Sequence, residues 1–166
     1  MKPEPTIRQA KPGDENAIHE AHMRSIREVC VKDHGEEEIR GWGNRPLGNR
    51  WVDAIKNDFV WVVEAQATIF GQGYIRFFEE GGRKKGHIHG LYLTPEVLRK
   101  GFGLKLARLM IEKAKEVGAT SITLESTITA HDFYKSLGFV DNGSMKRVDI
   151  AGFPVRCFPM ILEIES

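Results

Sequence analysis

Residues 91–118 read LYLTPEVLRKGFGLKLARLMIEKAKEVG and connect the end of an apolar strand to a helix through a turn with two closely spaced glycines. The apolar face expected for this helix is formed by Leu104, Ala107, Ile111 and Ala114. Gly118 fits the C-terminal stop of the helix. A helix that opens directly after such a turn presents unpaired backbone N–H groups at the positive end of its dipole. The stretch therefore predicts a helix whose first turn binds an anion such as a phosphate.

The composition of the turn favours the same kind of ligand. Gly101 and Gly103 allow the main chain to approach an anion closely. Positive charge is supplied nearby by Arg99, Lys100, Lys105 and Arg108. The Walker pattern is absent, and the dinucleotide fingerprint G-x-G-x-x-G fails because Leu106 occupies the position of its third glycine. These departures disfavour nucleotide hydrolysis and dehydrogenase chemistry, and a tight turn with ordinary surface lysines remains the structural alternative.

The rest of the chain predicts alternating strands and helices within one domain, residues 1–166. Before the turn we expect a strand at 5–10, a helix with an apolar face from Ile18 to Val29, helices at 36–42 and 48–56, and strands within 59–78 and at 87–94. After the turn we expect a strand at 121–126, a short helix at 131–138 and strands around 139–147 and 155–164. This order predicts an α/β sheet with at least one strand-helix-strand crossover, and such sheets bind ligands at the carboxyl ends of their strands.

The composition of the 166 residues excludes several classes of protein. With 41% hydrophobic residues, 28% charged residues and a net charge of +1, the chain resembles neither a disordered polyion nor a dedicated nucleic-acid binder. No apolar run reaches the roughly 20 residues that cross a bilayer. The opening MKPEPTIRQA lacks the plan of a signal peptide, so we expect a cytoplasmic location and neither a membrane nor a nucleic acid as partner. Cys30 and Cys157 lack metal-type spacing and are expected to be packing residues.

A second motif lies downstream, where residues 130–139 read AHDFYKSLGF. Together with the glycine turn it resembles the two hallmarks of the GNAT N-acetyltransferase superfamily, Q/R-x-x-G-x-G/A at a helix start and a later A-x-x-F-Y-x-x-x-G-F. The second hallmark is matched by Ala130, Phe133, Tyr134, Gly138 and Phe139. In the first hallmark Leu98 stands where the superfamily has Gln or Arg, and the basic residue is displaced to Arg99. The resemblance covers the chain from about Phe59 to the C-terminus.

The resemblance implies the GNAT fold, an α/β architecture with a mixed, mostly antiparallel twisted sheet of about six to seven strands and about four to five flanking helices. It also implies acetyl-CoA as cosubstrate, with the pyrophosphate on Leu98–Leu104 and the pantetheine arm beside Leu91–Leu93, where an extended chain can hydrogen-bond to a strand. The cofactor-binding residues that it implies are Leu91, Tyr92, Leu93, Leu98, Arg99, Lys100, Gly101, Phe102, Gly103, Leu104 and Phe133. A homodimer is one assembly that it implies, because the last strands of this fold often pair between subunits.

By its position in the second motif, Tyr134 resembles the general acid of the superfamily, which gives a proton to the departing thiolate. A phenol with a reference pKa near ~10 can supply that proton at neutral pH. The structural alternative is a core tyrosine whose hydroxyl only forms a hydrogen bond to the coenzyme or the main chain.

The base that accepts the amine proton has three candidates. Alternation along GHIHGLYL sends His87, His89, Leu91 and Leu93 to one face of a strand, so both imidazoles line one surface that leads to the cofactor strand. Histidine titrates near neutrality and accepts a proton directly or through water. The pair also resembles the histidine pair on the equivalent strand of arylalkylamine N-acetyltransferases. Glu125 competes as the base, and hydrogen-bonded structural histidines are the alternative reading.

Two further groups of residues invite a functional interpretation. His87 with His89, or His19 with His22, could each supply two metal ligands, but H-E-x-x-H is absent and nothing else clusters with them in sequence, so we expect no metal. The acidic run at 36–38 is typical of a solvated face. In the fold that the chain resembles, the first helices cover the acceptor site, so those acids with Trp42 and Trp51 could help to receive a cationic amine.

The sequence as a whole favours an acetyl-CoA-dependent acetyltransferase that acts on a small-molecule, peptide or protein amine. A coenzyme A sensor or partner-binding module of the same fold, with weak catalysis, is the alternative, and a metal-dependent hydrolase is a third class. The identity of the acceptor stays open at this stage, because fold alone does not determine it.

Overall fold

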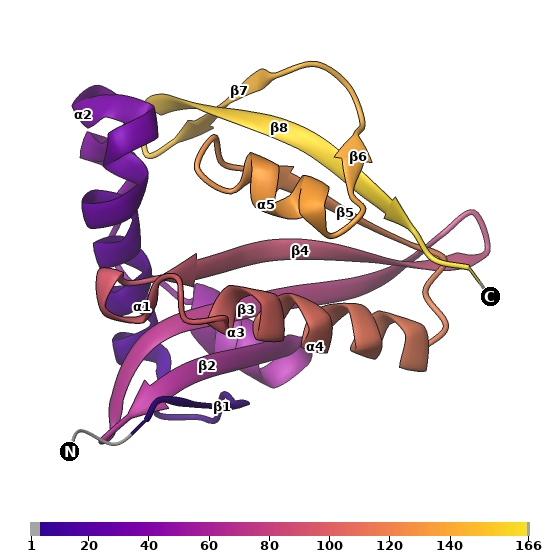
Figure 1. Ribbon diagram of the computed structural model, residues 1–166, viewed down its shortest axis with the longest axis horizontal. Coiled ribbons are helices and arrows are strands. Elements are labelled where there is room, and N and C mark those ends of the chain that lie inside the picture. The colour runs from indigo at the N-terminus through magenta and orange to yellow at the C-terminus, as the bar shows by residue number, and fades with distance from the viewer. Residues whose placement is uncertain (1–3, 166) are drawn as a thin grey trace.

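The computed structural model describes residues 4–165. Its strands form one sheet, and its helices lie on both faces of that sheet (Figure 1). The helical elements are α1 (Glu15–Ser25), the π-helical turn η1 (Ile26–Cys30), α2 (Val31–Trp42), α3 (Arg50–Asn57), the 3₁₀ turn η2 (Pro95–Val97), α4 (Phe102–Glu116) and α5 (His131–Ser136). The strands are β1 (Thr6–Gln9), β2 (Phe59–Ala65), β3 (Thr68–Glu80), β4 (Arg83–Leu93), β5 (Ser121–Ser126), β6 (Val140–Asp141), β7 (Lys146–Ile150) and β8 (Phe153–Glu163).

The sheet is mixed and mostly antiparallel, which confirms the predicted architecture. Its strand order is β1-β2-β3-β4-β5-β8-β6, with β7 paired to β8, and β4–β5 is the parallel pair. The described chain has eight strands in this sheet, more than expected, because the strand predicted at 139–147 is split. Its two parts, β6 and β7, are separated by a turn that contains Gly143 at φ 121°.

Strands β4 and β5 pair over only a short distance and then separate. Their register joins Gly86–Ile88 to residues 122–124, and beyond Ile88 the edge of β4 that faces β5 has no strand partner in the described structure. Figure 1 shows the two strands diverging toward α1 and α2. The opening lies at the carboxyl ends of two parallel strands, which is where the sequence predicted a ligand.

A β-bulge changes the side-chain pattern of β4. Tyr74 on β3 pairs with Gly90, and the next residue pairs with Ile88, so His89 is an extra residue. The prediction that Leu91 and Leu93 share a face with the two histidines is wrong. Both leucines pack into the core beneath α4, because one inserted residue reverses the alternation of everything that follows it.

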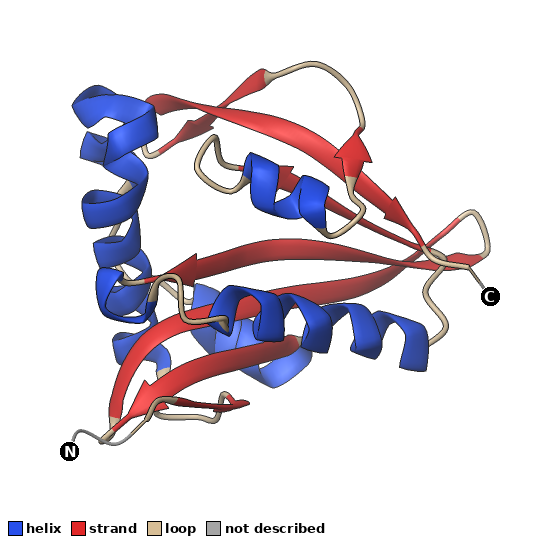
Figure 2. Ribbon diagram, in the orientation of Figure 1, coloured by secondary structure: helices blue, strands red, loops and turns tan. Residues whose placement is uncertain are grey.

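The helices cover the two faces of the sheet (Figure 2). Helix α4 packs on β3 and β4 with Leu106, Met110 and Ala114 fully buried, whereas the predicted face residues Leu104 and Ile111 are only half-buried. On the opposite face, α1 contacts β3 and β4 and α3 contacts β2. Among the helices of residues 4–165, none combines the length and apolar character that spanning a bilayer requires.

The first helices run as one bent rod along the open end of the sheet. Helix α1 passes through η1 into α2, and the helical path breaks at Gly35, where φ is 81° and ψ is 164°, so a new segment starts at the predicted position 36. The Ser25 hydroxyl donates a 2.8 Å hydrogen bond to the Leu93 carbonyl and ties this rod to the end of β4. On the other side α2 packs on β8, where Glu38 forms an ion pair with Arg156.

Candidate active site

Three cavities meet where β4 and β5 separate. The turn cavity, about 350 Å³, lies between η1, the end of β4 and the start of α4. The histidine cavity, about 300 Å³, lies on the other side of β4 beneath α2 and the β7–β8 hairpin. Between them the junction cavity, about 30 Å³, occupies the gap between the two diverging strands. Tyr92 lines all three, so the two large cavities share a wall.

The turn cavity gathers most of the residues predicted to bind a cofactor. Those that line it are Leu91, Tyr92, Leu93, Leu98, Arg99, Gly101, Gly103, Leu104 and Phe133. Lys100 and Phe102 do not, since the Lys100 side chain is exposed and the Phe102 ring is only 5% exposed within the core. The sequence prediction missed the opposite wall, formed by Ser25, Val29, Cys30, Thr127, Thr129 and Ala130. Of these, only Ala130 belonged to a recognisable motif.

The geometry of the turn fits a ligand with phosphates and an extended arm. Gly101 adopts a left-handed φ of 87° as the N-cap of α4, and the Lys105 N–H returns to its carbonyl at 3.1 Å. The N–H groups of the first helical turn, at 102–104, therefore have no helical partner and can bind an anion. The unpaired edge of β4 offers main-chain groups to the arm, and the apolar walls suit its hydrocarbon parts.

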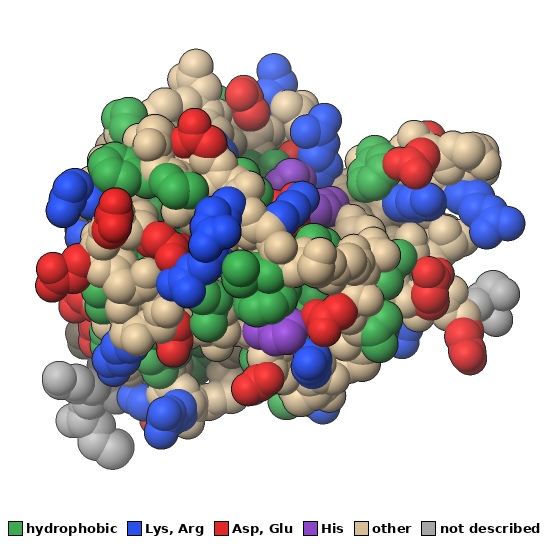
Figure 3. All heavy atoms as spheres, turned by 90° about the horizontal axis from the view of Figure 1, so that it is seen from above, with side chains coloured by type: hydrophobic (Ala, Val, Ile, Leu, Met, Phe, Trp, Pro, Cys, Tyr) green, Lys and Arg blue, Asp and Glu red, His purple; other side chains and the backbone are tan. Residues whose placement is uncertain are grey.

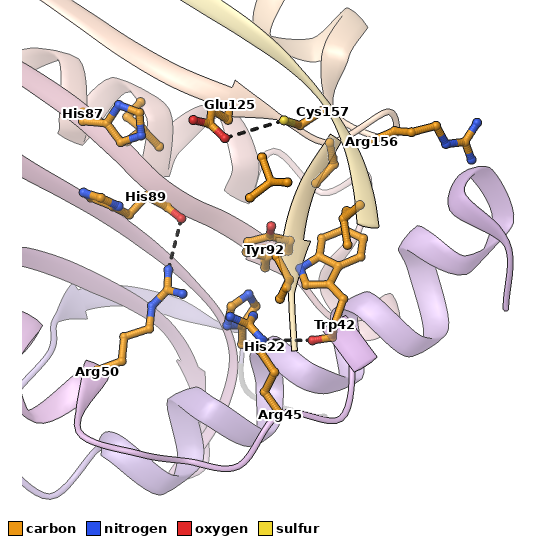
Figure 4. A pocket seen from close by; sticks show the side chains of 15 residues that line it. His22, Trp42, Arg45, Arg50, His87, His89, Tyr92, Glu125, Arg156 and Cys157 are labelled. Carbon is orange, nitrogen blue, oxygen red and sulfur yellow. Dashed lines mark hydrogen bonds between the residues drawn. The ribbon is translucent and has the colours of Figure 1, made fainter. Parts of the chain in front are cut away.

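The histidine cavity contains the three residues predicted as bases. His87 and His89 from β4 and Glu125 from β5 all line it (Figure 4). The two imidazole centroids lie 4.6 Å apart, and His87 Nδ1 is 2.8 Å from the Thr123 hydroxyl. Figure 3 shows histidine side chains close together near the upper centre of this face, with Lys or Arg side chains beside them.

The environment of this cavity keeps both histidines neutral near pH 7. Burial lowers the pKa of His87 below its usual value. Burial, followed by the charges of His87, Arg50 and Arg76, lowers the pKa of His89 to about 4. Each neutral ring has a lone pair that can accept a proton or a hydrogen bond.

Glu125 is held by two neighbours from the last strands. Lys146 Nζ lies 3.0 Å from one carboxylate oxygen, and the Cys157 thiol donates to the other at 3.6 Å. Burial, followed by the charge of Glu125, raises the pKa of the Cys157 thiol to about 11, so the thiol stays protonated as a donor. The two contacts orient the carboxylate toward β7 and β8, and Glu125 remains exposed.

Tyr134 from α5 lines the junction cavity together with His89 and Glu125. Its side chain is 4% exposed, and burial, followed by the neighbouring Tyr92, raises its pKa above the ordinary value. The phenol therefore keeps its proton at neutral pH. The structure thus brings Tyr134, His89 and Glu125 together at the junction cavity, and His87 lies beside His89 in the histidine cavity.

The structure corrects the role suggested for the acidic run and one of the tryptophans. Glu36 and Glu37 are exposed, Glu38 pairs with His34 and Arg156, and none of the three lines the histidine cavity. Trp42 lines the cavity as suggested, but Trp51 is 1% exposed and packs behind it.

His19 and His22 do not form a metal site with other side chains. Across residues 4–165, no group of three or more His, Cys, Asp or Glu side chains is placed to hold a metal. His19 Nε2 lies 2.9 Å from the Arg45 carbonyl. His22 is 2% exposed, lines the histidine cavity, and has no hydrogen-bond partner for either ring nitrogen among the described residues.

The sequence prediction missed the charged and apolar residues that complete the histidine cavity. Arg45 and Arg50 come from the α2–α3 loop and the start of α3, and Arg156 comes from β8. The apolar part of the hairpin wall is formed by Val148, Ile150 and Val155. These residues are far apart along the chain and belong to no short motif, so only the fold assembles them.

Comparisons with known proteins agree with this architecture. Residues 18–139 match the model of a protein family described as "Acetyltransferase (GNAT) family". A protein of Oryza sativa subsp. japonica, called "Probable glucosamine 6-phosphate N-acetyltransferase 2", is 34% identical over 68 residues, which is 41% of this chain and 41% of that relative. The chain thus matches less than half the length of this curated relative.

Solved structures share the fold over nearly the whole chain. A GCN5-related N-acetyltransferase from Rhodopseudomonas palustris superposes with a TM-score of 0.81 at 19% identity, covering 99% of this chain and 98% of that one. The PaiA N-acetyltransferase from Thermoplasma acidophilum, solved in complex with coenzyme A, gives a TM-score of 0.73 at 20% identity, covering 98% and 100%. Identities this low indicate a common fold and do not identify a common substrate.

Proposed function

This chain belongs to the acetyltransferase (GNAT) family, and we propose that it is an N-acetyltransferase that moves the acetyl group of acetyl-CoA directly to the primary amine of a small molecule. The observation that carries the proposal is the meeting of two large cavities at Tyr134, His89 and Glu125. One cavity suits a phosphate-bearing cosubstrate and the other a polar acceptor.

The turn cavity would hold acetyl-CoA. The N–H groups at the start of α4 would bind the pyrophosphate, and the edge of β4 at Leu91–Leu93 would bind the pantetheine arm. When bound there, acetyl-CoA supplies an activated acetyl group and leaves as a free thiol. Leu98 replaces the usual Gln or Arg of the motif, but the main-chain N–H groups at 102–104 that would bind the pyrophosphate are present.

The histidine cavity would hold the amine and remove its proton. Burial keeps His87 and His89 neutral near pH 7, and each of these rings can accept the amine proton directly or through a water, as can the carboxylate of Glu125. The carboxylate of Glu125 is best suited to bind an ammonium ion, because it supplies the negative charge on this wall of the cavity. We therefore assign Glu125 the first contact with the ammonium form and the neutral histidines the relay of its proton.

Tyr134 would complete the transfer as the general acid. Its phenol lies between the two compartments and keeps its proton because burial raises its pKa. The phenol gives that proton to the departing sulfur, while the base side of the cavity takes one proton from the amine, so the protein is reset by a net proton exchange with solvent.

A small acceptor suits the site better than a peptide. The histidine cavity is about 300 Å³, at the lower end of the range for small-molecule sites, and α2 and the β7–β8 hairpin wall it in. The rice relative adds a first compound to try, because its name specifies glucosamine 6-phosphate, although the match covers only 41% of each protein.

The proposal is tested with purified protein in two steps. Calorimetry first measures acetyl-CoA binding, and a thiol-release assay then screens amino sugars, amino acids, polyamines, arylalkylamines and peptide N-termini. Binding together with thiol release on a small amine is the expected result. Binding without release on any of these amines would favour the alternative of a coenzyme A-binding module, and absence of binding would overturn the assignment of the turn cavity.

A further inference from the structure

The charges that line the histidine cavity do not balance. Arg45, Arg50 and Arg156 line it, against a single carboxylate, Glu125. Arg156 is already paired with Glu38, and Glu125 with Lys146. Within residues 4–165, neither Arg45 nor Arg50 forms a salt bridge with a carboxylate. Two guanidinium groups therefore face the cavity without a counter-charge from the protein.

Both guanidinium groups are held in position by main-chain and aromatic contacts. Arg45 Nε donates to the Trp42 carbonyl at 3.0 Å, and Arg50 Nη2 donates to the His89 carbonyl at 3.2 Å. The Arg50 guanidinium also lies 5.2 Å from the Trp51 ring centre. A guanidinium has five N–H donors, so each arginine keeps most of them free for a ligand.

Burial of the two positively charged guanidinium groups, without a counter-charge, is unfavourable for the folded protein. Both side chains are half-buried, and burial, followed by the charge of Arg50, lowers the pKa of Arg45 below its usual value. The adjacent His22 is 2% exposed, and both of its ring nitrogens are unpartnered among the described residues. Burial and the charges of Arg50 and Arg45 lower its pKa as well, so it stays a neutral hydrogen-bonding group. An anion here would neutralise the arginines and give His22 a partner.

We infer that the acceptor amine carries an anionic group, a phosphate or a carboxylate, which binds Arg45 and Arg50 with His22 beside them. This inference rests on the proposed acetyltransferase function and deepens it. In Figure 4, Glu125 lies on one side of the cavity and Arg45 on the other, with Tyr92 between them. The amine end of the acceptor therefore points to Glu125 and the junction cavity, and the anionic end points to the α2–α3 loop. Planar guanidinium groups suit both phosphate and carboxylate, because each can accept paired hydrogen bonds.

The test compares amines that differ only in the anionic group. One arm uses a hexosamine 6-phosphate against the free hexosamine, and the other uses amino acids against their amides, with thiol release as the readout. We expect kcat/KM to favour the anionic member of at least one pair by about 10-fold or more, as one charge-assisted contact would give. The arm that shows this preference identifies phosphate or carboxylate as the recognised group.

Variants assign the preference to the two arginines. In Arg45→Gln and Arg50→Gln the preference should fall to near unity, mainly through KM, with acetyl-CoA affinity unchanged. Arg40→Gln is the matched control, because Arg40 is exposed on α2, does not line the cavity and carries the same charge. Equal turnover of both members of every pair by the unaltered protein would overturn the inference, and so would an equal loss of preference in the control.

Failure of the inference and failure of the proposed function look different. Turnover of neutral or cationic amines alone would sustain the acetyltransferase proposal and overturn the anionic acceptor. If no amine is turned over, calorimetry with the coenzyme A complex still compares the two members of each pair. Tighter binding of the anionic member, lost in Arg50→Gln, would then support the anion site even though the transfer reaction had failed.

Discussion

The two large cavities of this protein are built in opposite ways. The turn cavity depends on main-chain groups and apolar side chains from a run of sequence between Leu91 and Leu104, with one wall added by other elements. The histidine cavity depends on charged and aromatic side chains from α1, α2, the α2–α3 loop, β4, β5 and the β7–β8 hairpin. A ligand bound by backbone geometry leaves a local pattern in the sequence, and a ligand bound by distant side chains leaves none.

The largest expected effect tests whether the two cavities cooperate in one reaction. Tyr134→Phe removes the proposed proton donor at their junction and leaves the ring packing intact. We expect kcat to fall by about 100-fold or more, the usual range for loss of a general acid, while the affinity for acetyl-CoA changes little. Steady-state kinetics and calorimetry measure the two quantities.

The matched change is Tyr74→Phe, because the Tyr74 hydroxyl bonds to Asp58 at 2.8 Å and lines none of the three cavities. It should lose about 1–3 kcal/mol of unfolding free energy, the range for a hydrogen bond to a charged group, and retain turnover. A fully active Tyr134→Phe would remove this residue from the role of acid and leave the cavities without an identified proton donor.

A smaller effect separates the role of the Gly101 backbone in acetyl-CoA binding from the role of a left-handed glycine in protein stability. Gly101→Ala and Gly118→Ala both force alanine into a left-handed conformation, at φ 87° and 81°, with no atom within 4 Å of the new methyl group. Each should therefore lose about 1 kcal/mol of unfolding free energy. Only Gly101 lines the turn cavity, so only Gly101→Ala should also weaken acetyl-CoA binding, by about 10-fold.

Urea unfolding and calorimetry on the two alanine variants give the comparison. If both variants bind acetyl-CoA as well as the unaltered protein, the close approach of a ligand to the backbone at Gly101 is disproved.

The smallest effect concerns the acid sensitivity of the histidine cavity. The pKa values of His22, His87 and His89 are lowered in the folded protein, so below about pH 6.5 the unfolded chain binds more protons than the folded one. Stability should therefore fall as the pH decreases from 7 to 5. His22→Phe removes one of the three contributions and should therefore make the fall in stability between pH 7 and pH 5 smaller.

Urea unfolding at the two pH values checks this expectation. The turn cavity contains no histidine among its lining residues, so Gly101→Ala should keep the full pH dependence and serves as the reference. An unchanged slope in His22→Phe would contradict the neutral, buried state of this histidine.

Sequence reasoning succeeded where one short segment carries both the structure and the chemistry. The turn at Gly101 and the helix after it followed from the first motif, and the short helix that carries Tyr134 followed from the second. It failed for the face of Leu91 and Leu93, because a bulge depends on pairing with β3 and leaves no mark in the alternation of β4 alone.

The arginines of the acceptor side illustrate a second limit. Arg45 lies in a loop rich in Gly, Asn and Pro, and Arg156 lies in a strand whose partner α2 is more than a hundred residues away in sequence. Their convergence on one cavity is a property of the packed helices and hairpin. No spacing rule within the sequence brings them together, so the inference of an anionic acceptor depends on the three-dimensional structure.

The extra residue at His89 marks a position where the histidine cavity can change during evolution without a change in strand pairing. Residues on either side of it remain paired with β3, since Ile88 still faces Ile75 and Gly90 faces Tyr74. Insertion or loss of a single codon at this point would add or remove one cavity side chain and leave the core leucines where they are. Such a change at the bulge would alter the side chains of the histidine cavity and leave the turn cavity as it is.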